Sequence, residues 1–192
     1  MNKIILIGGG GHCKSVIDVI EQDSRYQIAG IIDKPNLLGQ LILGYPIIGN
    51  DFDLENLSKK FKYALVTVGH IKSPLLRIRL FELAIKLGFK LPCIISPKAH
   101  VSKHSQIGNG TIIMHNSVVN ANVIIGENCI INTKALIEHD CIISSHCHVS
   151  TNATINGNVN IESGTFIGSN STIVESIKIK KNSFIKAGTL VK

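Results

Sequence analysis

The feature that most constrains the fold is a six-residue period in the second half of the chain. From Val101 onward every sixth residue, as far as Val191, is isoleucine or valine. Neither an α-helix nor an alternating β-strand has this period. It is typical of a solenoid in which short strands, three to a coil, stack as a parallel β-helix with the branched side chain inward. Sixteen hexad positions therefore predict about five coils.

Two other hexad positions support this prediction. Three residues after the branched position, asparagine or glycine recurs: Gly110, Asn116, Asn122, Asn128, Asn152, Asn158, Gly164 and Asn170. These residue types tolerate the left-handed backbone conformation that a tight corner requires. Four residues after the branched position the residue is usually small: Thr111, Ser117, Cys129, Ala135, Cys141, Cys147, Ala153, Thr165 and Ser171. We expect the small set to point inward beside the Ile and Val stack.

The first half of the chain has a different pattern, which ends near Ser96-Pro97, where the six-residue period begins. Apolar runs such as KIILIG, QIAGIID and YALVTVG alternate with the helical patterns KSVIDVIEQD and SPLLRIRLFELAIKLG. Strand–helix–strand alternation predicts a small Rossmann-like α/β domain with a parallel sheet. The expected organisation is an α/β domain at 1–96 followed by a β-helix at 97–192.

Composition narrows the expected partners and compartment. The formal net charge is +7, but the lysines are scattered and lack interleaved aromatic residues, which argues against nucleic acid. Small anionic ligands such as nucleotides and coenzyme A account for the charge equally well. Only four apolar residues precede the N-terminal glycines, and no run of some eighteen apolar residues occurs, so neither a signal peptide nor a membrane partner is expected. Five cysteines without framework spacing fit reduced thiols in the cytoplasm.

Residues 137–150, IEHDCIISSHCHVS, combine three histidines, two cysteines and one aspartate, which suggests a metal site or a catalytic centre. The hexad register separates these residues. Cys141 and Cys147 occupy the small inward position, so we expect buried apolar side chains rather than metal ligands. His139 and His146 fall at corners that do not converge on one point. The pattern therefore predicts no metal.

His139 is expected to have space beside it. Coils repeat every eighteen residues, so His139 stacks between Ala121 and Gly157, about 4.8 Å from each. Small residues at corners are also common by chance, and spacing alone leaves a functional and a structural explanation open.

These motifs resemble a known family. Residues 99–192 are similar to the left-handed β-helix acyltransferases of the hexapeptide-repeat superfamily. With GGGGH near its start and NTKALIEHDCIISSHCHVS in the coils, the whole chain resembles a bacterial family of sugar acyltransferases. That family includes the UDP-4-amino-sugar N-acetyltransferases of bacillosamine synthesis and the sialic acid O-acetyltransferases. The resemblance implies acetyl-CoA as co-substrate, direct transfer without an acyl-enzyme, and a homotrimer with the coenzyme cleft between neighbouring prisms.

The resemblance also implies roles for individual residues of the β-helix. His139 corresponds to the general base of the family's EH[DE] motif, and Asp140 to the acid that orients it. Asn132, His148 and Gly157 match positions near the reacting acetyl group and the coenzyme. His148 fits a packed strand residue equally well.

The N-terminal stretch IILIGGGGHCKSVIDVI predicts a strand, a glycine turn and a helix. Gly8-x-Gly10 resembles a dinucleotide fingerprint, but Cys13 occupies the third glycine position. The resemblance implies that this domain binds the nucleotide of a nucleotide sugar through Gly8, Gly10, Gly11, His12, Asp33 and Gly69. A turn that merely needs glycine is the structural alternative for each glycine.

Four functions remain to be distinguished. The first is N-acetylation of a nucleotide-linked 4-amino-4,6-dideoxysugar in glycan biosynthesis, and the second is O-acetylation of sialic acid or a related sugar. A γ-type carbonic anhydrase also uses a left-handed β-helix, but that family lacks the α/β domain, and His139, His146 and His148 do not reproduce its zinc ligands. The small neighbours of His139 argue against the fourth, a non-catalytic scaffold that binds nucleotide sugars.

Overall fold

The computed structural model describes residues 1–192 and divides the chain into two compact units. The first contains Met1–Gly69 and Leu75–Pro92, and the second contains His70–Pro74 and Cys93–Lys192. The first unit is an α/β domain and the second is a left-handed parallel β-helix, which confirms the predicted fold class.

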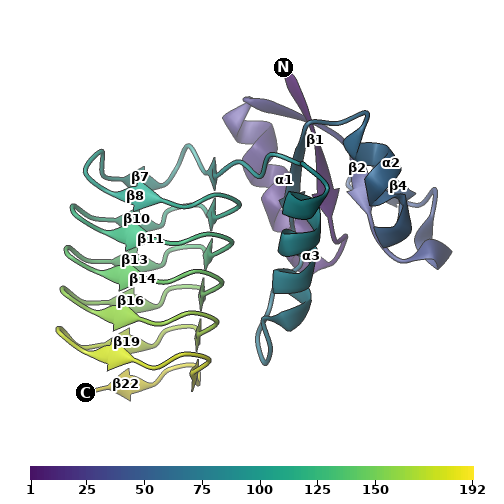
Figure 1. Ribbon diagram of the computed structural model, residues 1–192. Helices are drawn as coiled ribbons and strands as arrows, with labels where there is room; N and C mark the ends of the chain where they lie inside the picture. Colours follow the sequence, from purple (N-terminus) through teal and green to yellow (C-terminus); the bar gives the residue numbers. More distant parts are fainter. The chain divides into compact units, whose positions relative to one another are not determined.

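The α/β unit is built on a five-stranded sheet (Figure 1). Its strands are β1 (Asn2–Ile7), β2 (Tyr26–Ile32), β3 (Leu41–Ile42), β4 (Tyr45–Gly49) and β5 (Tyr63–Val66). They lie in the order β3-β4-β2-β1-β5, and only the β3–β4 pair is antiparallel. The carboxyl ends of the four parallel strands therefore lie at one edge, where open α/β sheets bind their ligands.

The helices of this unit are α1 (Gly11–Asp23), α2 (Leu54–Ser58) and α3 (Leu75–Lys86), with 3-10 turns at Pro35–Leu37 and Asp51–Asp53. Ile5 and Ile7 of β1 pack in one apolar cluster with Leu54 of α2 and Phe81 of α3. The alternate residues of β1, Ile4 and Leu6, face the opposite side of the sheet and are equally buried. A parallel strand covered on both faces explains the unbroken apolar run IILI. None of the helices combines the length and the apolar composition that crossing a membrane requires.

The β-helix consists of three sheets of two-residue strands, stacked from β7 to β22 in Figure 1. One sheet contains β6 (Ile94–Ile95), β9 (Ile112–Ile113), β12 (Ile130–Ile131), β15 (His148–Val149), β18 (Phe166–Ile167) and β21 (Phe184–Ile185). The second contains β7 (His100–Val101), β10 (Val118–Val119), β13 (Leu136–Ile137), β16 (Thr154–Ile155), β19 (Thr172–Ile173) and β22 (Leu190–Val191). The third contains β8 (Gln106–Ile107), β11 (Ile124–Ile125), β14 (Ile142–Ile143), β17 (Asn160–Ile161) and β20 (Lys178–Ile179). Each strand pairs in parallel with the strand one coil later, as Ile137 does with Ile155.

The core of the β-helix is the predicted stack. The branched residues from Ile113 to Ile173 are at most 2% exposed, and every small residue of the predicted inward set is 0% exposed. Each fully buried isoleucine contributes roughly 1.5–3 kcal/mol, so this stack is the main source of stability. The series also extends one hexad before Val101, because Ile95 of β6 pairs with Ile113. The β-helix therefore begins before Pro97.

The corners of the coils have the left-handed backbone that the sequence predicted. Their φ angles lie between 55° and 73° at Gly110, Asn116, Asn122, Asn128, Lys134, Asp140, His146, Asn152, Asn158, Gly164, Asn170, Ser176, Asn182 and Gly188. Most are asparagine or glycine, the residues that adopt this conformation most readily. Asp140 and His146 replace them within the histidine-rich stretch.

Candidate functional site

The corner after β13 holds His139 and Asp140 in a direct hydrogen bond. His139 Nδ1 lies 2.7 Å from Asp140 Oδ2. Asn122, one coil earlier, donates from Nδ2 to Asp140 Oδ1 at 2.7 Å. The hydrogen bond from Asn122, followed by that from His139, lowers the pKa of Asp140 below its ordinary value. Asp140 is therefore an ionised acceptor at neutral pH.

This pairing fixes which nitrogen of His139 can accept a proton. A carboxylate only accepts hydrogen bonds, so Nδ1 of the neutral ring carries the hydrogen and Nε2 keeps its lone pair. Nε2 makes no hydrogen bond in the structure, and the His139 side chain is 64% exposed. The corner thus presents an oriented and accessible proton acceptor.

The His139 ring lies over Gly157, its neighbour one coil later. Asn158 N donates to His139 O at 2.9 Å, which holds the two corners together. A β-carbon at Gly157 would stand 2.8 Å from His139 Cε1 and 2.9 Å from Nε2. The space that the sequence predicted beside His139 is therefore partly occupied by the imidazole itself.

A cleft of about 580 Å³ opens at this corner. It is lined by Glu138, His139, Asn156, Gly157, Asn158, Glu175 and Ser176. Glu138 accepts a hydrogen bond from Asn120 Nδ2 at 2.8 Å, while Glu175 makes no hydrogen bond or ion pair. Two glutamates but no lysine or arginine line the cleft, so its charge favours a cationic ligand.

The family resemblance also assigned Asn132 and His148 to the coenzyme. These two side chains contact each other and do not line this cleft. Asn132 Nδ2 donates to His148 Nε2 at 3.2 Å, and His148 Nδ1 donates to the carbonyl of His70 at 2.7 Å. His148 is 7% exposed, and its ring centroid lies 5.1 Å from that of Phe166. The structure thus places His148 as a packed strand residue.

The histidines of residues 137–150 have separate surroundings. His146 Nδ1 contacts Asn128 Nδ2 at 3.1 Å, whereas His139 pairs with Asp140. No three His, Cys, Asp or Glu side chains of the chain are arranged to hold a metal ion. This arrangement differs from a zinc centre built on three histidines.

The glycine turn after β1 is held by Asp33. Asp33 Oδ2 accepts a hydrogen bond from Gly9 N at 2.6 Å, and its Oδ1 accepts one from Lys34 N at 2.7 Å. A β-carbon at Gly9 would lie 2.7 Å from Asp33 Oδ2, and one at Gly8 (φ +106°) would collide with Val68 Cγ2. Asp33 therefore braces the turn. Gly9 was not among the predicted site residues, although it is one of four consecutive glycines.

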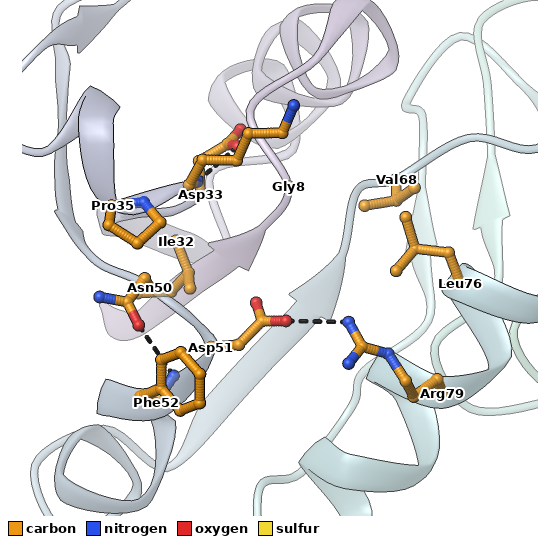
Figure 2. Close-up of a pocket in the computed structure, with 11 residues that line it drawn as sticks. Gly8, Ile32, Asp33, Pro35, Asn50, Asp51, Phe52, Val68, Leu76 and Arg79 are labelled. Atoms are coloured by element: carbon orange, nitrogen blue, oxygen red, sulfur yellow. Dashed lines mark hydrogen bonds and ion pairs between the residues drawn. The ribbon is translucent and has the colours of Figure 1, made fainter.

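A cavity of about 330 Å³ lies at the carboxyl ends of the parallel strands (Figure 2). It is lined by Gly8, Ile32, Asp33, Lys34, Pro35, Asn50, Asp51, Phe52, Val68, Leu76 and Arg79. Of the residues predicted to bind the nucleotide, it brings together only Gly8 and Asp33. Gly10 and Gly11 lie at the start of α1, and Gly69 lies beside His12, where its β-carbon would be 3.4 Å from His12 Cβ.

Three further residues that line this cavity, Asp51, Phe52 and Arg79, were not predicted from the sequence. Asp51 and Arg79 face each other, with Arg79 Nη2 3.0 Å from Asp51 Oδ2 (Figure 2). Phe52 lies on the same 3-10 turn as Asp51 and is 91% exposed. The turn follows β4, which was not among the predicted strands, so no predicted element marked these residues.

Comparisons with known proteins match both units. A model of the PglD N-terminal domain matches residues 3–82, and a model of the bacterial transferase hexapeptide with six repeats matches residues 104–138. Among curated proteins, none matches this sequence.

Solved structures match over the whole chain. PerB from Caulobacter crescentus, in complex with CoA and GDP-perosamine, is 30% identical with a TM-score of 0.93, and the match covers 100% of this chain and 89% of PerB. A mutant of perosamine N-acetyltransferase from the same organism, with the same two ligands, is 29% identical over the same shares, also with a TM-score of 0.93. The acetyltransferase domain of PglB from Neisseria gonorrhoeae, in complex with acetyl coenzyme A, is 30% identical with a TM-score of 0.90, covering 100% of this chain and 93% of that one.

Proposed function

The chain belongs to the hexapeptide-repeat family of bacterial sugar acyltransferases, and from that premise we propose that it transfers an acetyl group from acetyl-CoA to the amine of a nucleotide-linked 4-amino-4,6-dideoxysugar. The proposal rests mainly on the hydrogen bonding and exposure of His139 at its corner of the β-helix. Its Nδ1 is bound to an ionised carboxylate, and its Nε2 is open to a cleft of about 580 Å³. This is the arrangement that a general base requires.

The proposed reaction is a direct transfer. The acetyl thioester supplies an electrophilic carbonyl carbon. The sugar amine, once its protonated form has lost one proton to solvent, forms a C–N bond to this carbon through its lone pair. His139 Nε2 accepts the proton that this nitrogen loses, and Asp140 stabilises the resulting imidazolium through Nδ1. His139 returns the proton to the sulfur as the C–S bond breaks. The products are the N-acetylated sugar and the free thiol of coenzyme A, with no acyl-enzyme.

The charge of the cleft favours an amine over sialic acid as acceptor. Glu138 and Glu175 are the carboxylates that line the cleft, and no lysine or arginine lines it. A protonated amino sugar is attracted to such a surface, whereas the carboxylate of sialic acid is repelled. Similarity to proteins solved with GDP-perosamine and acetyl coenzyme A supports the same choice. O-acetylation remains the second candidate, because the same base would serve a hydroxyl.

The test is a thiol-release assay with acetyl-CoA and a panel of nucleotide-linked 4-amino sugars, with sialic acid as comparison. We expect release only with an amino sugar, and a product one acetyl group heavier by mass spectrometry. We expect a chelator to leave the rate unchanged. Transfer to sialic acid alone would replace the proposal with O-acetylation. Stoichiometric bound zinc, with activity lost to the chelator, would contradict the proposed chemistry.

A further inference from the structure

We propose that the cavity of the α/β unit selects a guanine nucleotide, with Phe52 stacking on the base and the Asp51–Arg79 pair binding its edge. This inference rests on the proposed function in one respect, that the cavity holds the nucleotide of a nucleotide-linked sugar. It adds the identity of the base and the residues that recognise it.

Phe52 presents an exposed aromatic ring, which stacks on no other ring, from a turn whose backbone is held. It is 91% exposed on the Asp51–Asp53 turn. Asn50 Oδ1 accepts a hydrogen bond from Phe52 N, and Asp53 Oδ2 accepts one from Asn50 N, both at 2.9 Å. These bonds hold the backbone of the turn, so Phe52 remains at the edge of the cavity. A nucleobase stacked on its ring would cover this apolar surface.

The Asp51–Arg79 pair places an acceptor beside a donor at the same cavity (Figure 2). Only Asp51 Oδ2 is bonded to Arg79, and Asp51 Oδ1 accepts no hydrogen bond. The side chains are 39% and 62% exposed, and a pair this exposed contributes little to stability. Asp51 keeps an open acceptor, and Arg79 keeps open donors, because a guanidinium has five N–H groups.

Guanine matches this pair better than the other bases do. Its edge places a carbonyl oxygen beside two adjacent N–H donors, from the ring nitrogen N1 and the amino group N2. The carboxylate of Asp51 can accept both N–H groups, and Arg79 can donate to the carbonyl oxygen. Uracil offers one N–H between two carbonyls, and adenine and cytosine offer one amino group beside a ring acceptor. Because hydrogen bonds to a charged group are the strong ones, the second N–H favours guanine.

The test is calorimetric titration of the full chain with GDP, IDP, UDP, CDP and ADP. IDP is the informative comparison, because hypoxanthine is guanine without the amino group. We expect GDP to bind on the order of tenfold more tightly than IDP, since a good base contact discriminates by about fivefold to a hundredfold. Asp51→Asn should lower the affinity for GDP to that for IDP. Phe52→Ala should weaken GDP and IDP equally.

Asp23→Asn is the matched control. It removes the carboxylate of another Asp–Arg pair in the same unit, that of Asp23 and Arg25, which lies away from the cavity. Its affinities should equal those of the wild type. The thermal unfolding midpoint of each variant verifies that its fold is retained.

Equal affinity of the wild type for GDP and IDP, or tighter binding of UDP, would overturn the inference. So would an Asp51→Asn variant that keeps the wild-type preference for GDP over IDP. If the wild type acetylates a nucleotide-linked amino sugar without guanine preference, only this inference fails. If it selects GDP and acetylates no sugar, the proposed function fails instead.

Discussion

The imidazole of His139 lies directly over Gly157, so that a β-carbon on Gly157 would stand 2.8 Å from His139 Cε1. Real β-carbons do not approach other atoms this closely, so the ring occupies a place that only glycine leaves open. The relationship follows from the coil repeat, because residues eighteen apart in the sequence stack at the same corner. The identity of residue 157 therefore controls the position of the proposed base.

Gly157→Ala should displace the base without unfolding the coils. Gly157 does not have a positive φ, so alanine is compatible with its backbone and only the imidazole must move. A misplacement of about 1 Å can cost a hundredfold in rate, and we expect kcat to fall roughly tenfold to a hundredfold. Steady-state kinetics and thermal unfolding measure the two effects. A wild-type kcat in this variant would show that His139 does not act from its observed position.

Asn122→Ala should raise the pKa of Asp140, because the hydrogen bond from Asn122 is the largest cause of its lowering. In the wild type the pKa of Asp140 is lowered. The His139–Asp140 pairing is therefore fully present at any pH above the ordinary pKa of aspartate. It is lost only as the pH falls through the lowered pKa of Asp140. Asp140 should consequently remain ionised throughout the neutral and weakly acidic range. Carboxyl titration by NMR measures the shift, and an unchanged or lowered pKa in the variant would contradict it.

The thiols should be almost inert in the folded protein. Cys13, Cys129, Cys141 and Cys147 are 0% exposed, and only Cys93 is partly exposed. Burial raises the pKa of Cys13 to about 11 and raises that of Cys141. A hydrogen bond with Cys129, and then burial, raise the pKa of Cys147. Because the thiolate is the reactive form, we expect at most one fast reaction with a thiol reagent, and five after unfolding. Two or more fast thiols in the native protein would contradict the buried positions.

We expect a homotrimer in solution. Ile124 and Ile142 pair on adjacent coils of one sheet and are each 42% exposed, which leaves an apolar face to cover. Ile142→Lys should dissociate the trimer and leave the coils intact, because Lys178 already occupies the same column two coils later. Light scattering at micromolar concentration measures the mass. A monomeric wild type would contradict the expected assembly.

The β-helix and its corner site could be predicted because their signals repeat. Each hexad specifies the same strand and the same corner, and pairing at eighteen residues places His139 beside Gly157 without further information. The bond between His139 and Asp140 joins adjacent residues. Because these contacts join residues that are adjacent or eighteen apart, they could be predicted from the sequence alone.

The rest of the site depends on contacts that no period encodes. Asp51 and Arg79 lie 28 residues apart, one after a strand and the other on a helix, and only the folded sheet brings them together. The environment of His148 likewise comes from the carbonyl of His70, 78 residues away. Asp33 was predicted at the nucleotide site from the family resemblance, but its bond to Gly9 N depends on how the glycine turn folds back.

The most direct test of the account is the turnover of His139→Ala, with acetyl-CoA and a nucleotide-linked amino sugar both saturating. A positioned general base contributes about a hundredfold to ten-thousandfold, and we expect kcat to fall within that range. Fold, assembly and affinity for acetyl-CoA should be retained, because the exposed corner side chain lies outside the Ile stack. Asp140→Asn should lose less, since it keeps the proton acceptor. Near wild-type turnover of His139→Ala would contradict the assignment of His139 as the base.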